Sequence, residues 1–74
     1  MMELIRGNEY RIRLTNGNWT IGVFLYEKEP FRVYTNRVYT NRTHFMFRNV
    51  ATDRLIEIKS KARIREIKLI GVTQ

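Results

Sequence analysis

Apolar and polar residues alternate with a period of two along most of the chain, which predicts β-strands. Tyr10, Ile12 and Leu14 alternate with arginines, and the Asn16-Gly17 pair that follows is a strong signal for a tight hairpin. The returning strand, residues 19–26, ends before Pro30. Its odd positions are Trp19, Ile21, Val23 and Leu25, and its even positions include Phe24 and Tyr26. We therefore expect apolar cover on both sides of this strand, or a contact with another copy of the chain.

The alternation resumes after residue 43. The segment "HFMFR" places Phe45 and Phe47 on one side, and the other side carries His44, Met46 and Arg48. Ala51-Thr52-Asp53 predicts a turn, and "LIEIK" alternates isoleucines with charged residues. Isoleucines then recur at every third position from 64 to 70. This spacing fits either a short helix or a 3₁₀ turn that leads into a strand, and the high content of β-branched residues favours the second.

Five or six short strands joined by tight turns predict an all-β fold, in the form of a small closed or nearly closed barrel. The 74 residues support one domain, spanning 1–74. A domain of this size buries only about 60–65% of the surface that its unfolded chain exposes. The sequence contains no Cys, so disulfides cannot compensate for the small core. We therefore expect a homo-oligomer, in which contacts between copies bury further surface.

Two stretches resemble the motifs of the Sm-like family. The stretch "IRLTNGNWTIGVF" is similar to the first Sm motif, and its matching residues are Leu14, Asn16, Gly17 and Gly22. The stretch "IEIKSKARIREI" resembles the second motif, with Ile56 and Ile58 before a basic turn and Ile64 and Ile67 after it. Together the two stretches cover about a third of the chain. The resemblance implies an Sm-like or SH3-like small barrel, although Lys59-Ser60 stands where the family has Arg-Gly in its late loop.

The positive charge is concentrated in the middle of the chain. The formal net charge is +7, and Arg outnumbers Lys by ten to four. No acidic residue occurs between Glu29 and Asp53, whereas that interval contains four arginines. Arg binds phosphate through two parallel hydrogen bonds and stacks on bases, so this pattern predicts a nucleic-acid partner. A basic surface that contacts only solvent is the alternative interpretation.

Within this interval, residues 32–42 read "RVYTNRVYTNR", a five-residue unit written twice. In one straight strand an odd period would send the two copies to opposite faces, so we expect the chain to reverse. A reversal at Thr35-Asn36 places Val33 opposite Val38 and gathers Arg and Tyr on the other face. A turn at Thr40-Asn41 is the competing placement. In both cases the sequence predicts a basic Arg/Tyr hairpin at 31–49.

Aromatic rings stack on unpaired bases while Arg contacts phosphates, so this hairpin suits single-stranded nucleic acid or RNA. The candidate contacts are Arg32, Tyr34, Arg37, Tyr39, Arg42, His44, Arg48, Lys59, Lys61 and Arg63. A second basic set, which the sequence does not place, consists of Arg11, Arg13, Lys59, Lys61, Arg63 and Arg65. The alternative hypothesis is a protein-interaction or assembly factor, such as a small viral or mobile-element protein, in which the hairpin binds protein. A purely structural hairpin is a third interpretation.

Catalytic chemistry has little support in the sequence. His44 is the only His and Asp53 is the only Asp, and residues in these numbers and at this spacing do not predict a Ser-His-Asp or Cys-His set. One His without Cys offers no zinc site. We therefore expect a protein that is not an enzyme and that needs neither cofactor nor metal. No apolar run approaches about 18 residues, and the first residues are charged too early for a signal peptide. These features predict a cytoplasmic protein without a membrane partner.

Overall fold

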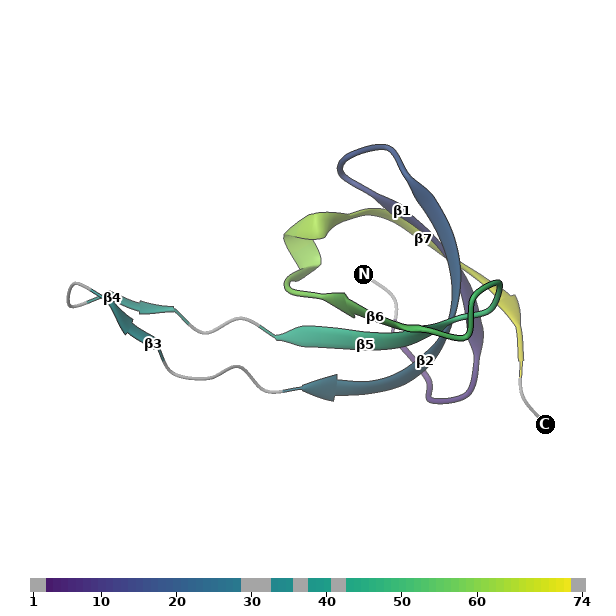
Figure 1. Cartoon of the computed structure of the whole chain (residues 1–74), viewed down its shortest axis with the longest axis horizontal. Coiled ribbons are helices and arrows are strands. Elements are labelled where there is room, and N and C mark those ends of the chain that lie inside the picture. The colour runs from purple at the N-terminus through teal and green to yellow at the C-terminus, as the bar shows by residue number, and fades with distance from the viewer. Residues whose placement is uncertain (1–2, 29–32, 36–37, 41–42, 73–74) are drawn as a thin grey trace.

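The computed structural model describes residues 3–28, 33–35, 38–40 and 43–72 of the chain (Figure 1). The strands are β1 (Glu9–Leu14), β2 (Trp19–Lys28), β3 (Val33–Thr35), β4 (Val38–Thr40), β5 (His44–Asn49), β6 (Leu55–Ile58) and β7 (Ile64–Gly71). A 3₁₀ turn, η1 (Lys61–Arg63), leads directly into β7. These elements confirm the all-β fold class. They also confirm that the isoleucine spacing after residue 61 reflects a 3₁₀ turn followed by a strand.

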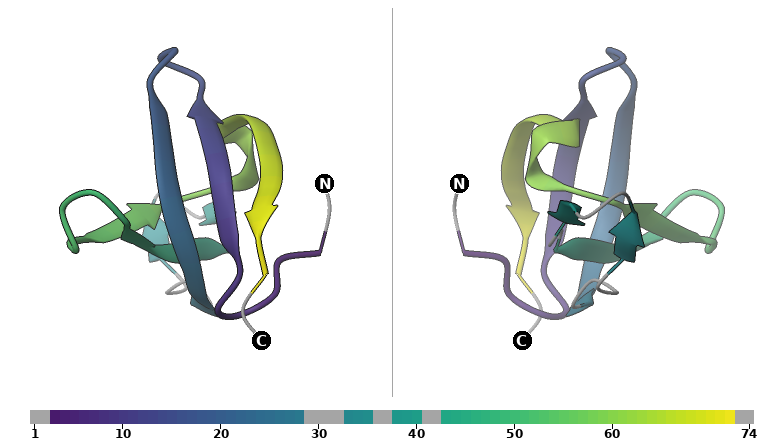
Figure 2. Two further views of the ribbon diagram at one scale, coloured as in Figure 1. Left: turned by 90° about the vertical axis from the view of Figure 1, so that its right-hand side faces the viewer. Right: turned by 90° about the vertical axis from the view of Figure 1, so that its left-hand side faces the viewer.

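Five of the strands form one antiparallel sheet in the order β6-β5-β2-β1-β7. The sheet curls strongly, so that β6 and η1 lie across from β1 and β7 (Figures 1 and 2). It does not close into a barrel, because β6 and β7 are edge strands that do not pair with each other. Leu14, Ile56 and Ile64 pack against the core.

The core fills the inner side of the curled sheet. Its buried side chains are Tyr10, Ile12, Phe24, Phe45, Phe47 and Ile58. The ring of Phe47 meets Phe24 and Tyr10 edge to face, with centroids 5.4 and 6.4 Å apart. Such aromatic pairs add about 0.5–1.5 kcal/mol to the gain from burial alone. The buried Tyr10 hydroxyl accepts a 2.8 Å hydrogen bond from the backbone N–H of Ile5, so its polar end is satisfied.

As far as Phe24, strand β2 faces the core with its even positions, whereas Tyr26 is 50% exposed. Gly22 and Phe24 are buried, whereas Trp19 and Ile21 are exposed. The pairing with β5 shifts after Phe24, which leaves Leu25 as the extra residue of a β-bulge. Met46, which alternation places on the same side as His44 and Arg48, is only 6% exposed. The outer side of the sheet therefore includes both a buried methionine and exposed large apolar residues.

Strands β3 and β4 form a separate two-stranded sheet, which confirms a hairpin in the repeat. Its pairs are Val33 with Thr40, Tyr34 with Tyr39, and Thr35 with Val38. The predicted pairing of Val33 with Val38 is therefore wrong by two positions on β4, and the competing turn at residues 40–41 is also wrong. The chain reverses between residues 35 and 38. The repeat permits this two-residue shift because Val33 has a β-branched partner in either register, Val38 or Thr40.

The close contact between β2 and β5 gives a test of the core. A Cβ atom at Gly22 would lie 2.9 Å from Cβ of Phe47, which no rotamer change can relieve. We expect Gly22→Ala to lower the free energy of unfolding by about 1–3 kcal/mol, the usual cost of overpacking. Ile21→Thr, a neighbouring exposed position on the same strand, should change it by about 0.5 kcal/mol or less. Urea denaturation followed by circular dichroism measures both, and equal stabilities would contradict the contact.

Candidate functional site

The structure places only part of the predicted site. Arg32, Arg37 and Arg42 lie outside the described residues. Tyr34 on β3 is paired directly with Tyr39 on β4. For these two residues the structure describes the backbone register only. The side chains of the remaining predicted residues are described, and they separate into two groups.

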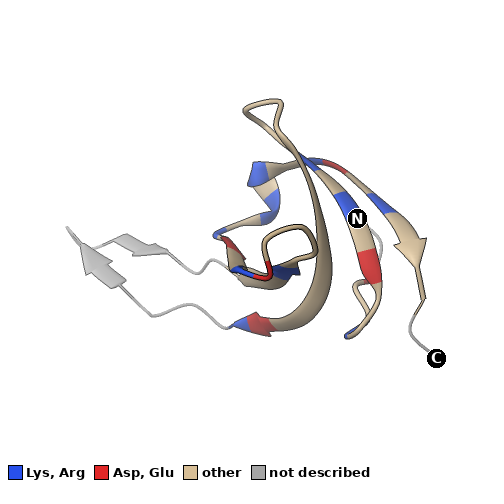
Figure 3. Cartoon of the chain, turned by 45° about the vertical axis from the view of Figure 1, so that its right-hand side comes forward, with Lys and Arg blue, Asp and Glu red and all other residues tan. Residues whose placement is uncertain are grey.

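The first group surrounds η1. Lys59, Lys61 and Arg63 are exposed, and none of them takes part in an ion pair within the described part of the chain. We call residues 59–63 the basic turn, and Figure 3 shows Lys and Arg gathered there. The backbone carbonyl of Arg63 accepts a 3.0 Å hydrogen bond from Thr15, which fixes the basic turn against the β1–β2 hairpin. A depression of about 290 Å³ lies between them and is lined by Leu14, Thr15, Asn16, Ile56, Glu57, Ile58, Lys59 and Arg63.

The second group consists of His44 and Arg48, which are tied to carboxylates. Nδ1 of His44 lies 2.9 Å from Oε1 of Glu57 on the neighbouring strand. The Arg48 guanidinium donates a 2.9 Å hydrogen bond to Oδ1 of Asp53. An exposed pair of this kind contributes at most about 1 kcal/mol, so it does not lock the side chain in place. It does lower the local positive charge, and both residues are therefore weaker candidates for phosphate contacts than the basic turn.

A further surface, which the sequence did not reveal, lies on the outer side of β1, β2 and β7. We call it the Trp19 face and define it by Arg11, Trp19, Ile21, Val50 and Ile70. Its four apolar residues are each 41–44% exposed. They line a depression of about 710 Å³ together with Arg11, Thr20, Asn49 and Ala51. The Trp19 face therefore exposes a continuous apolar surface with a cation at its side.

Two arginines of the unplaced basic set lie against the indole ring of Trp19. Cζ of Arg11 is 4.2 Å from the ring centroid, and Cζ of Arg13 is 5.4 Å from it. Both distances are in the range of cation–π attraction. The sequence could not show this surface, because β2 has apolar residues at both odd and even positions. The one signal in the sequence is Gly22, which lies two residues before Phe24. A residue without a side chain at this position lets another strand approach closely, which indicates that the even positions face the core.

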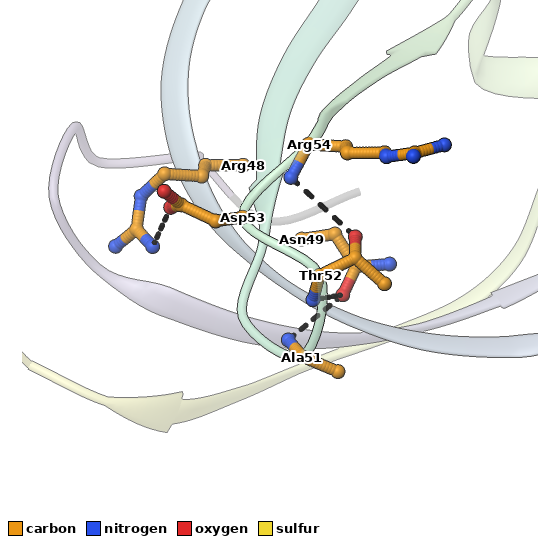
Figure 4. Close-up of polar contacts among 6 residues, drawn as sticks. All are labelled: Arg48, Asn49, Ala51, Thr52, Asp53 and Arg54. Carbon is orange, nitrogen blue, oxygen red and sulfur yellow. Dashed lines mark hydrogen bonds and ion pairs between the residues drawn. The ribbon is translucent and has the colours of Figure 1, made fainter.

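The β5–β6 turn, residues 49–54, holds the edge of the Trp19 face (Figure 4). Oδ1 of Asn49 accepts hydrogen bonds from the backbone N–H groups of Ala51 and Thr52, at 2.9 and 3.3 Å. The N–H of Val50 donates to the carbonyl of Ile21 at 3.0 Å, which docks the turn on β2. Asp53 has φ of 60°, a left-handed conformation that Asp tolerates better than most residues. The predicted turn at 51–53 is therefore confirmed.

Within the ranges that the structure describes, no cluster of three or more His, Cys, Asp or Glu side chains could hold a metal ion. The described residues also contain no helix that is long and apolar enough to cross a membrane.

Comparisons of the chain with protein-family models, with curated proteins and with solved structures find no match. Function is therefore inferred from the side chains and from their arrangement.

The Asn49 side chain provides a test of how the turn is held. Asn49→Ala removes the acceptor for two backbone N–H groups, and we expect the free energy of unfolding to fall by about 1–2 kcal/mol. Asn49→Asp keeps an acceptor oxygen in the same position, so it should retain most of the stability. Thermal unfolding of the two variants distinguishes them. If both variants are destabilised equally, the backbone contacts of Oδ1 do not hold the turn.

Proposed function

We propose that this protein binds nucleic acid without catalysing a reaction, and that its ligand is RNA or another single-stranded nucleic acid. The observation that carries this proposal is the basic turn. Three exposed cations lie within five residues there, and no ion pair with a described carboxylate neutralises them. Like charges held this close repel one another, and a polyanion that binds them releases its own counterions. A basic surface that contacts only water keeps this repulsion and gains no free energy from the release of counterions.

The Arg/Tyr hairpin is the second element of the proposal. The role of its arginines is inferred from the sequence alone. The structure pairs Tyr34 directly with Tyr39, and this register supports two aromatic residues opposite each other. Opposed residues of an antiparallel pair share one face of the ribbon. Two aromatic residues at such positions suit the stacking of successive bases. We propose that the hairpin binds bases while the basic turn binds phosphates.

The Sm-like or SH3-like relationship also belongs to this proposal. The motif residues Asn16 and Gly17 form the β1–β2 turn, in which Gly17 has φ of 89° and Oδ1 of Asn16 accepts a hydrogen bond from the backbone N–H of Asn18. The motif residue Gly22 lies where β5 approaches β2. The turn and the close strand approach explain why Asn and Gly occur at these motif positions. They support a small β scaffold, and the Sm-like identity remains our proposal.

The salt dependence of binding tests the role of charge. We expect replacement of Lys59, Lys61 and Arg63 by Gln to weaken binding to a single-stranded oligonucleotide. The slope of log K against log salt should shrink by about 0.7 for each phosphate that the variant no longer binds. Replacement of Arg32, Arg37 and Arg42 by Gln tests the hairpin in the same way. Gln at Arg6 and Arg54, two exposed cations elsewhere, is the control and should have little effect. If neither triple variant changes the slope, these cations do not bind phosphate.

Tyr34→Ala with Tyr39→Ala completes this test. Stacking releases no counterions, so the affinity should fall while the salt slope stays the same. The alternative function, a hairpin that binds protein, predicts that these Tyr changes leave nucleic-acid binding intact. If the Tyr changes unfold the protein and the Arg changes leave binding intact, the repeat has a structural role.

The open edges of the sheet support our proposal that the protein assembles. Among the strands that the structure describes, β6 and β7 each have a neighbour on one side only. Such edges present unpaired backbone groups that a second chain can pair with. We expect light scattering to report a dimer or a larger ring at micromolar concentration, after nuclease treatment and at high salt. These conditions exclude copies that are bridged by nucleic acid. A strict monomer would contradict the assembly.

A further inference from the structure

We propose that the Trp19 face is a stacking platform for single-stranded nucleic acid, in addition to the hairpin and the basic turn. This inference rests on the proposed function and extends it to a surface that the sequence did not assign. A base would contact Trp19, Ile21 and Ile70. Arg11 and Arg13, which lie over the indole ring in the free protein, would turn from the ring to phosphates, and Lys68 would contact phosphates beside them.

The Trp19 face combines two chemical features. Trp19, Ile21, Val50 and Ile70 are close to half exposed and lie around one depression. The strand register places three cations and one carboxylate beside them, because Arg11 pairs with both Ile21 and Lys68, and Arg13 pairs with both Trp19 and Glu66. Within the described residues, Arg11, Arg13 and Lys68 take part in no ion pair. The occupant must therefore supply an apolar surface and negative charge within a few ångströms of each other. Each nucleotide of a single strand supplies both.

Single-stranded nucleic acid fits this face better than a peptide does. The indole lies over β1 and β2, which each have a paired strand on both sides, and only Ile70 lies on the edge strand β7. An extended peptide lying there would find no free backbone partners for its own N–H and C=O groups, which it would have at a sheet edge. A base needs no such partners, because its ring stacks while its polar edges stay in water.

A second copy of this chain and a double helix fit less well. A twofold contact of this face with itself would bring together two surfaces on which Arg11, Arg13 and Lys68 outnumber the carboxylates of Glu9 and Glu66, so their net charges repel. A double helix keeps its bases stacked on one another, so it can offer phosphates to the arginines but no base to the indole. The apolar part of the face would then stay uncovered.

Trp19 is the only Trp of the chain, so its fluorescence reports on this face alone. The test titrates the protein with single-stranded oligouridylate of about 12 nucleotides, which lies within the usual site sizes. The indole emission and the anisotropy of a fluorescent label on the oligonucleotide are followed together. We expect the indole emission to fall with the same midpoint as the anisotropy rises. A duplex of the same length should raise the anisotropy and leave the indole emission unchanged.

Substitutions then separate stacking from charge. Trp19→Ala should weaken oligouridylate binding about 5- to 150-fold without changing the salt slope, whereas Trp19→Phe should retain part of the affinity. Arg11→Gln should reduce the slope by about 0.7. Ile5→Ala, an exposed apolar residue outside this face, is the matched control and should bind like the unaltered protein. Circular dichroism of each variant confirms that it is folded.

The outcomes separate this inference from the proposed function. If the anisotropy rises while the indole emission and the Trp19→Ala affinity stay unchanged, nucleic acid binds elsewhere, and only the inference is overturned. If no oligonucleotide changes the anisotropy, the proposed function fails and the inference fails with it. If an acidic peptide that contains aromatic residues quenches Trp19 and oligouridylate does not, the Trp19 face is a protein-binding surface and the inference is overturned.

Discussion

The contact between Gly22 and Phe47 determines how the rest of the sheet is arranged. Without a side chain at Gly22, β5 approaches β2 so closely that one added carbon atom would lie 2.9 Å from Cβ of Phe47. This approach brings the Phe47 ring against Tyr10 on β1 and Phe24 on β2, so that one residue joins three strands of the core. A bulge at Leu25 comes directly after Phe24 in the same strand pair, and bulges increase the local twist of a strand. Close packing and twist together give the sheet its curl.

The same contact decides which side chains of β2 face outward. Since Gly22 and Phe24 face the core, alternation turns Trp19 and Ile21 to the outer side, where β1 carries Arg11 and Arg13. The outward direction of Trp19 and Ile21 is therefore a consequence of the core packing alone. A β2 register shifted by one residue would bury the indole and expose Phe24.

The sequence predicts the elements of this fold better than it predicts their relations. Period-two alternation predicts β1, β5 and β6, and Asn16-Gly17 predicts the turn between β1 and β2. The inner face of β2 was not predictable, because both of its faces are apolar in the sequence. The register of the repeat was not predictable either, since Val33 finds a β-branched partner in Val38 or in Thr40. Closure of the barrel depends on whether β6 and β7, which are distant in the sheet, pair with each other, and no local sequence pattern carries that information.

For the site, the charge of the basic turn could be read from the sequence, whereas the ion pairs of His44 and Arg48 required the structure.

Charge and exposed aromatic surface both act against the stability of the isolated protein. A net charge of +7 repels itself within a chain of 74 residues, and an exposed indole contributes little to a core that is already small. A ligand that carries regular negative charges relieves the first cost, and one that carries flat apolar rings relieves the second. Any ligand that binds only the folded state also stabilises it by mass action. Single-stranded nucleic acid satisfies both conditions at each nucleotide. The two contributions to binding differ in their salt dependence, because the contribution from charge weakens as salt rises and the contribution from stacking does not.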